Sequence, residues 1–334
     1  MVYDYLRMVK LLHYFLVVAA CISLISCNRG GRAFTMVLLP DTQTYAEKYP
    51  EVLEAQTQWI AAHADSFAFV LQQGDLTQSN NHEEWQVVEE SLARLDGKIP
   101  YTFVPGNHDM GSEPGKFADV RNTTLLNQYL PLSRYQALPT FGETFEAGKV
   151  DNTYHRFKAG GHNWLILSLE FGPRNEVLDW ANGVVEKHPD YKVILNTHAY
   201  LYSDSTLHDG EDWWRPQGYG IGKDTGAQAP NDGAQIWEKL VKKHSNMMFV
   251  FSGHVLHDGE GTLVSEGIHG NKVYQMLANY QEGVKGSEKG GNGYLRLITV
   301  DPKAKTIEVK TYSPYLDTYM TEPKQQFMFQ NVDL

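Results

Sequence analysis

The stretch Phe-Thr-Met-Val-Leu-Leu-Pro-Asp-Thr-Gln, residues 34–43, sets the pattern on which the rest of the chain is built. Its apolar run, 34–39, predicts a buried strand, and Pro40 ends that strand because proline cannot donate a ladder hydrogen bond. Asp41 and Gln43 follow at once. A buried strand that leads directly into polar side chains is typical of an α/β sheet, in which ligands bind beyond the carboxyl ends of the strands.

The same arrangement recurs along the chain. Four further clusters each follow a predicted strand: Gly74-Asp75 after 67–71, Gly106-Asn107-His108-Asp109 after 101–104, His198 after 193–195, and Gly253-His254 after 248–251. Each cluster alone is weak, since a lone Asp after a strand is usually part of a turn. Because the carboxyl ends of the strands line one crevice, we expect all five clusters to meet in space. Oxygen and imidazole ligands suit divalent Mn, Fe or Zn, so the set predicts a metal site.

The segments between these strands predict a layered α/β fold. Amphipathic helices are expected at 52–64, 82–95, 177–186 and 236–243, with a further strand at 164–169. The runs 273–277, 294–300 and 306–312 have no helix between them and predict an antiparallel meander that completes a sheet. The segments 111–148 and 203–232 resist assignment. The second is rich in aromatic residues, and it either forms a functional rim or packs its own aromatic side chains.

Composition excludes several classes of protein. The chain has 334 residues, of which 42% are hydrophobic and 21% charged, so it is an ordinary globular sequence rather than a disordered one. Its net charge of −11 argues against nucleic-acid binding by bulk charge. The two cysteines, Cys21 and Cys27, lie near the N-terminus, which excludes a disulfide framework or a zinc–thiolate site in the body.

The N-terminal segment reads as a targeting signal. Arg7 and Lys10 precede an apolar run, 11–26, that is too short for a spanning helix of roughly 20 residues. Its end, Leu24-Ile25-Ser26-Cys27, resembles the bacterial lipobox; Cys21 also fits, but cleavage there would leave an apolar mature end. We expect a lipoprotein-type signal peptide at 1–26, a short tether at 27–33 and one domain at 34–334. Cys27 would then carry the lipid that anchors the protein in the bacterial cell envelope, periplasmic or outer-membrane, and the membrane would be contacted through that anchor only. A buried N-terminal helix is the alternative.

The ordered set of clusters resembles the calcineurin-like metallophosphoesterase superfamily over 34–312. The resemblance implies a four-layer α/β/β/α sandwich of two mixed sheets with two divalent metal ions at the sheet edge. It also implies hydrolysis of a small phosphate monoester or diester by a metal-bound hydroxide. The implied roles are a first-ion ligand (Asp41), a bridging ligand (Asp75), second-ion ligands (Asn107, His198, His254), a general acid (His108) and a residue that orients its imidazole (Asp109).

Two positions depart from the superfamily pattern, and both fall on the first ion. Asp-x-His is replaced by Asp41-Thr42-Gln43, and Gly-His-x-His by Gly253-His254-Val255-Leu256-His257. Leu256 cannot bind a metal, and His257 is displaced by one position. Three alternatives follow: a two-metal enzyme in which Gln43 and His257 are substitute ligands, a one-metal enzyme, or a non-catalytic binding lipoprotein on the same fold.

Overall fold

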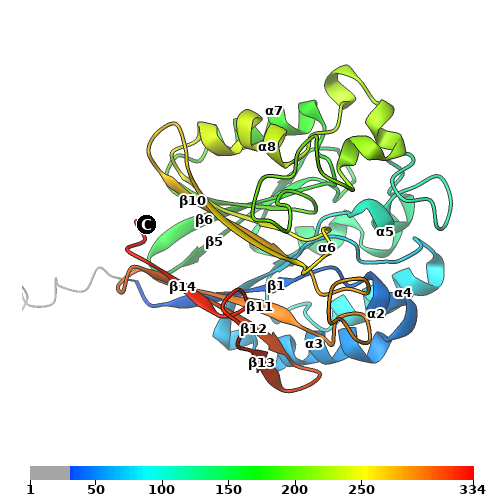
Figure 1. Ribbon diagram of the computed structural model, residues 1–334, viewed down its shortest axis with the longest axis horizontal. Coiled ribbons are helices and arrows are strands. Elements are labelled where there is room, and N and C mark those ends of the chain that lie inside the picture. Colours follow the sequence, from blue (N-terminus) through cyan, green and yellow to red (C-terminus); the bar gives the residue numbers. More distant parts are fainter. Residues whose placement is uncertain (1–30) are drawn as a thin grey trace, which may run out of the picture.

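The computed structural model describes residues 31–334, so the predicted signal peptide and the lipid attachment at Cys27 lie outside the described residues. Two mixed sheets pack face to face, and helices cover the outer face of each, which gives four layers (Figure 1). The four-layer α/β/β/α sandwich predicted from the resemblance is therefore the observed fold.

The first sheet, sheet A, has the strand order β13-β12-β11-β1-β2-β3, with β14 paired to β12. Its strands are β1 (Phe34–Leu39), β2 (Phe67–Gln72), β3 (Tyr101–Thr102), β11 (Leu295–Asp301), β12 (Thr306–Ser313), β13 (Thr318–Met320) and β14 (Phe327–Gln330). β1, β2 and β3 run parallel, while β11 pairs antiparallel with both β1 and β12.

The second sheet, sheet B, has the order β4-β5-β6-β7-β8-β10-β9. Its strands are β4 (Phe141–Thr144), β5 (Thr153–Ala159), β6 (His162–Leu169), β7 (Tyr191–Thr197), β8 (Met247–Ser252), β9 (Glu260–Glu266) and β10 (Lys272–Ala278). The adjacent strands β6, β7, β8 and β10 are parallel to one another. The carboxyl ends of the parallel strands of each sheet therefore lie together at one edge of that sheet.

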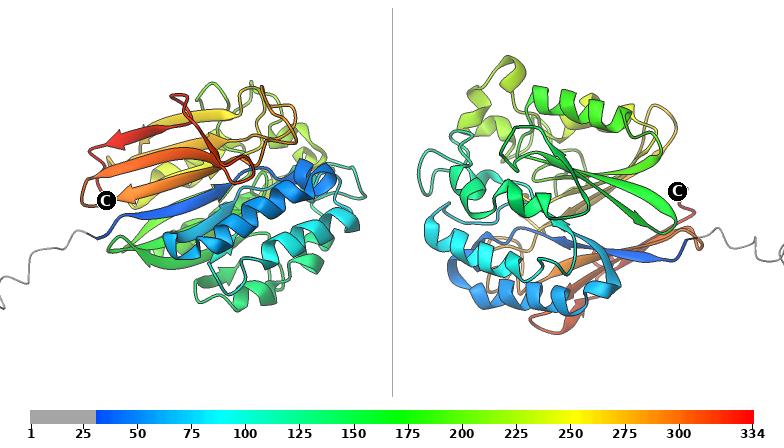
Figure 2. Two further views of the ribbon diagram at one scale, coloured as in Figure 1. Left: turned by 90° about the horizontal axis from the view of Figure 1, so that it is seen from below. Right: turned by 180° about the vertical axis from the view of Figure 1, so that it is seen from behind.

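Helices flank both sheets. They are α2 (Gln43–Lys48), α3 (Pro50–Ala62), α4 (His82–Ala93), α5 (Thr124–Tyr129), α6 (Leu132–Gln136), α7 (Asn175–Glu186) and α8 (Gly233–Lys239). α3 and α4 lie side by side across the outer face of sheet A, and α7 covers sheet B (Figure 2). Asn81 caps the N-terminus of α4: its side chain accepts a hydrogen bond from the backbone N–H of Glu84 and so satisfies one free donor of the first turn.

The apolar run of β1 is explained by burial on both faces. Met36 and Leu38 face sheet B and contribute to the core between the sheets, whereas Val37 and Leu39 pack toward α3 and α4. Successive side chains of a strand point to opposite faces, so a strand covered on both sides needs apolar residues at every position. This double burial fixes β1 and thereby the position of Asp41 beyond its end.

One sequence prediction about the sheets is wrong. The runs 294–300 and 306–312 do form an antiparallel pair, β11 and β12, but 273–277 does not belong with them. It forms β10, which lies in sheet B, parallel to β8 and antiparallel to β9. A short apolar run has the same sequence pattern in either direction, so its pairing partner decides its orientation.

The two unassigned segments differ in structure. The segment 111–148 contains α5, α6 and β4, while 203–232 forms short 3₁₀ turns, among them Pro216–Gly218 and Gly220–Lys223. Within residues 31–334, no helix combines the length and the apolar character that crossing a bilayer requires.

Candidate metal centre

The five predicted clusters meet at the sheet edge. Asp75, His198 and His254 each place one ligand atom within 4.8 Å of the others, and all three side chains are buried. They come from the ends of β2, β7 and β8, which lie in both sheets. The fold therefore brings together residues that are far apart in the sequence, as the strand-end argument predicted.

Two glycines leave room for this convergence. A Cβ on Gly106 would lie 2.1 Å from Asp75 Oδ1, and one on Gly253 would lie 2.0 Å from Asp41 Oδ1. Real Cβ atoms do not approach other atoms so closely, so any side chain at either position would push a carboxylate away. The backbone of both loops is thus packed directly against the acidic residues.

Backbone carbonyls fix both imidazoles. His198 Nδ1 lies 2.7 Å from Gln73 O, and His254 Nε2 lies 2.8 Å from Trp214 O. A carbonyl oxygen can only accept a hydrogen bond, so these two nitrogens carry hydrogens and the opposite ring nitrogens face inward. Such outer contacts of metal-binding histidines fix the ring orientation.

The inward atoms crowd around one point. His198 Nε2 lies 3.2 Å from His254 Nδ1, 3.1 Å from Asn107 Oδ1 and 3.2 Å from Asp75 Oδ1. With both rings neutral, four electron-rich atoms would face one another without a hydrogen between them. Such a set is stable only around a positive charge, which either a proton or a metal cation can supply.

The pKa values of these side chains also reflect the need for a positive charge in the cluster. Burial lowers the pKa of His198, but the Asp75 carboxylate outweighs burial and raises it to about 9. Burial together with the charge on His198 holds the pKa of His254 well below its usual range. Burial opposes ionisation of Asp75, yet the imidazoles of His198 and His108 outweigh it and hold the pKa of that carboxyl below its usual range. A carboxylate, an amide oxygen and two imidazoles fit a divalent cation of the Mn, Fe or Zn type.

Asp41 lies beside this group but has other partners. Both of its carboxylate oxygens are 3.1 Å from the backbone N of His254. Its Oδ2 also accepts hydrogen bonds from Asn279 Nδ2 at 3.2 Å and from Gln281 Nε2 at 3.0 Å. Burial raises the pKa of Asp41 to about 8.

Asn279 and Gln281 were missed by the sequence reasoning. They follow β10, the strand that the sequence placed in the antiparallel meander. Had 273–277 been read as a parallel strand, the same strand-end argument would have found them, because polar residues directly follow its end. Gln43 joins them: its Nε2 donates to Asp75 Oδ2 at 3.1 Å and to Gln281 Oε1.

His257 does not join the cluster. Its side chain is exposed, and its Nε2 lies 3.1 Å from the hydroxyl of Tyr202. Its ring centroid lies 5.3 Å from that of Trp214, on the rim of the site. The structure therefore places it away from the position that the substitute-ligand alternative requires.

His108 lies at the mouth of the site and is partly exposed. Its Nδ1 donates to Gln78 O at 2.7 Å, its ring stacks against Phe117, and its Nε2 is 3.9 Å from Asp75 Oδ2. The imidazole is thus oriented by a backbone carbonyl and an aromatic ring, with Nε2 facing the carboxylate.

Asp109 does not contact the imidazole of His108, contrary to the expected orienting role. Its Oδ2 accepts from the backbone N–H groups of Leu76 and Gly106, and its Oδ1 from the backbone N–H and hydroxyl of Thr77. It is fully buried and ties the loop after β2 to the loop after β3. Burial, reinforced by the Asp75 charge, raises its pKa to about 6.

A cavity of about 100 Å³ opens onto the cluster. It is lined by Asp75, Asn107, His108, Trp214, Tyr219, His254, Leu256 and Gln281. Trp214 and Tyr219 also line an adjoining hollow of about 610 Å³ formed by the segment 203–232. That segment therefore walls the site, as the rim alternative expected.

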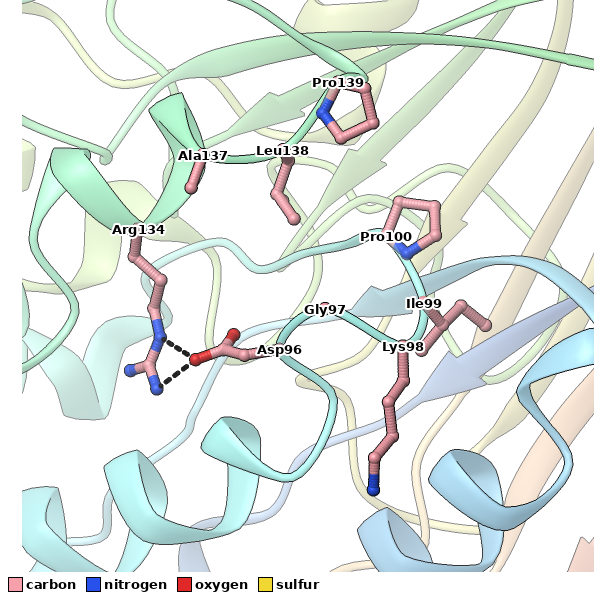
Figure 3. A pocket seen from close by; sticks show the side chains of 9 residues that line it. All are labelled: Asp96, Gly97, Lys98, Ile99, Pro100, Arg134, Ala137, Leu138 and Pro139. Carbon is pink, nitrogen blue, oxygen red and sulfur yellow. Dashed lines mark hydrogen bonds and ion pairs between the residues drawn. The ribbon is translucent and has the colours of Figure 1, made fainter.

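Another cavity, of about 410 Å³, lies away from this edge (Figure 3). It is lined mostly by apolar residues between the turn that precedes β3 and the end of α6, and its polar contact is an ion pair of Arg134 with Asp96. None of the clustered ligand residues lines it. Asp75, Asn107 and His254 instead line the smaller cavity at the strand ends.

Comparison with known proteins agrees with this geometry. The family model described as calcineurin-like phosphoesterase matches residues 34–258. The chain is 30% identical over 295 residues to "Uncharacterized protein YvnB" of Bacillus subtilis (strain 168), an alignment that covers 85% of this chain and 20% of that protein. Among solved structures it is similar to the purple acid phosphatase PPD1 of yellow lupin (Lupinus luteus) seeds, with a TM-score of 0.54, 13% identity and coverage of 90% of this chain and 54% of the other. The chain thus spans about a fifth of the bacterial relative and about half of the plant enzyme.

Proposed function

The chain belongs to the calcineurin-like phosphoesterase family, and from that premise we propose that it is a metal-dependent hydrolase of a small phosphate ester. Family membership places it among hydrolases that act on phosphoric ester bonds. The observation that carries the proposal is the convergence of the Asp75, Asn107, His198 and His254 ligand atoms on one point beside an open cavity.

These four side chains would hold the divalent cation. The cation, when bound, supplies charge that neutralises phosphoryl oxygens and acidifies water for attack on phosphorus. Asn107 and Asp75 would contribute oxygen ligands, while the carbonyls of Gln73 and Trp214 keep the two imidazoles turned inward. Because the ligands are locked before substrate binds, little reorganisation is needed during the reaction.

His108 would give the proton to the leaving oxygen. Its Nδ1 hydrogen is committed to Gln78 O, so Nε2 is the nitrogen available to the substrate. Nε2 lies within reach of the cluster, since it is 3.9 Å from Asp75 Oδ2. A positioned histidine of this kind contributes about 100-fold or more to the rate.

The aromatic wall would receive the leaving group. Trp214 and Tyr219 border both the cavity at the cluster and the wider hollow beside it. An organic group attached to the phosphate can therefore extend from the cluster across these two rings. The test therefore includes both a phosphate monoester and a phosphate diester.

The test uses the purified full chain loaded with Mn²⁺, with p-nitrophenyl phosphate and bis(p-nitrophenyl) phosphate as substrates. We expect turnover that a chelator abolishes. His108→Ala should keep the metal and lose about 100-fold in kcat, whereas His254→Ala should lose both metal and activity. His269→Ala, at an exposed position outside the site, is the control. Absence of hydrolysis with Mn²⁺, Fe²⁺ and Zn²⁺ alike would favour the non-catalytic binding alternative.

We also propose that Cys27 is acylated and that the protein is held in the bacterial cell envelope. The support is the lipobox-like Leu24-Ile25-Ser26-Cys27 at the end of an apolar run. Labelling with a fatty acid should mark the wild-type protein and not Cys27→Ala. Equal labelling of the two would reject the anchor.

A further inference from the structure

Two glutamines lie between the carboxylates that would share the first metal ion. Gln281 Nε2 donates to Asp41 Oδ2 at 3.0 Å, and Gln43 Nε2 donates to Asp75 Oδ2 at 3.1 Å. The two amides are also hydrogen-bonded to each other, from Gln43 Nε2 to Gln281 Oε1. A continuous chain of hydrogen bonds, which we call the amide bridge (Gln43 and Gln281), thus runs from Asp41 to Asp75.

The amide bridge is buried, so its polar groups depend on one another. Gln43 is fully buried and Gln281 is 8% exposed, while Asp41 and Asp75 are 3% and 1% exposed. Amide N–H groups bring partial positive charge to both carboxylates without a net charge of their own. The amide bridge therefore reduces the repulsion between the two carboxylates, as a cation between them would.

A metal ion at this position needs lone pairs that point at it, and the amide bridge presents hydrogens. Asp41 Oδ2 already accepts from Gln281 and Asn279. Gln43 Oε1 is the one oxygen of the bridge without a hydrogen-bond partner among the described residues. At the first metal position, both carboxylates thus accept hydrogen bonds from N–H donors, and a single amide oxygen is free. These groups do not provide the several lone pairs that a divalent ion needs for its coordination.

Among residues 31–334, neither Leu256 nor His257 completes the ligand set of the first position. Leu256 lines the cavity at the motif position where the superfamily has a histidine, and it has no ligand atom. His257 is turned toward Tyr202 on the rim. The disagreement with a two-metal site is therefore confined to the first position, while the group around His198 and His254 remains complete.

We propose that the chain binds one metal ion, held by Asp75, Asn107, His198 and His254, and that the amide bridge replaces the first cation of the family. The inference rests on the proposed function only in that the second position binds metal. Asp41 is then a positioning residue: it accepts from the backbone N–H of His254 and holds the loop after β8.

Metal content of the purified full chain tests the inference directly. After equilibration with Mn²⁺ and removal of free metal, elemental analysis should give one ion per chain. Electron paramagnetic resonance should show the resolved hyperfine lines of an isolated Mn²⁺ ion. Two ions per chain with a spin-coupled signal would overturn the inference and leave the proposed function intact. A chain that binds no ion at all would overturn both.

Variants locate the ion and test the bridge. Asp41→Asn should retain one ion, because Asp41 is not a ligand, whereas His198→Ala should retain none. Gln281→Glu replaces an N–H donor with a third carboxylate and should raise the content from one ion to two. Gln326→Glu adds the same charge at an exposed position and should leave one ion.

Two results would contradict the one-ion assignment or the role of the amide bridge. Loss of the ion in Asp41→Asn would place it at the first position and contradict the assignment. A folded Gln281→Glu chain that still binds one ion would show that the amide bridge is not what excludes the second. Far-ultraviolet circular dichroism establishes that each variant is folded before its metal is counted.

Discussion

Replacing Asp109 by Asn changes one buried atom and tests how the two loops of sheet A are joined. Asp109 accepts two backbone N–H groups on Oδ2, from Leu76 at 3.0 Å and Gly106 at 2.8 Å. Its Oδ1 accepts the backbone N–H and the hydroxyl of Thr77 at 2.9 and 3.0 Å. An asparagine has one oxygen, so its NH₂ group must face at least one of these donors.

The magnitude follows from counting the donors left without an acceptor. If the NH₂ group faces Thr77, the hydroxyl can turn and accept, and one buried backbone N–H is orphaned. If it faces Leu76 and Gly106, two are orphaned. Each orphan costs about 1–3 kcal/mol, and the loss of charge assistance adds to it, so we expect a loss of about 2–4 kcal/mol.

Guanidinium unfolding of Asp109→Asn, without added metal, measures this loss. Asp119→Asn is the matched control, because Asp119 also accepts hydrogen bonds from two backbone N–H groups, of Ser112 and Val120, but in an exposed setting where water can replace them. A change in Asp109→Asn no larger than in the control would refute the reasoning. Unchanged stability with a lower kcat would instead restore the role of orienting His108.

Two further predictions concern other parts of the molecule. Burial lowers the pKa of His155 to about 3, below its usual 6.5, so the folded state binds fewer protons than the unfolded state between these values. The free energy of unfolding should therefore fall as the pH drops from 6.5 toward 3, by about 1.4 kcal/mol per pH unit, and acid titration of His155→Phe should remove that part of the slope. A slope unchanged in the variant would contradict the argument. For Trp214→Ala we expect unchanged metal content, because the backbone carbonyl that holds His254 remains, but a raised KM for an aryl phosphate, because the ring borders the cavity. Loss of metal in this variant would mean that the side chain itself fixes the carbonyl.

The sequence could predict the fold and the ligand cluster because both follow from local patterns. A strand buried on both faces is apolar throughout, as β1 is, and the parallel strands present their ends at one edge. Asp75, His198 and His254 were found in this way.

What the sequence could not predict depends on pairing between distant segments. β9 (Glu-Gly-Thr-Leu-Val-Ser-Glu) is mostly polar and lacks regular alternation, so it gave no strand signal. Without β9 the direction of β10 was undetermined, and Asn279 and Gln281 were overlooked. The resemblance to the superfamily implied that Asp109 orients the imidazole of His108. They lie in a 3₁₀ turn, Asn107–Asp109, where neighbouring side chains diverge by about a third of a turn.

The contact between Trp214 O and His254 Nε2 joins the rim segment (203–232) to a proposed metal ligand. If the order of that segment and the occupancy of the centre are coupled through this hydrogen bond, the coupling is reciprocal: a cation that fixes His254 steadies the rim, and a molecule that steadies the rim tightens the hold on the cation by the same factor. Affinity for the ion would then depend on what is bound at the rim as well as on the ligand side chains.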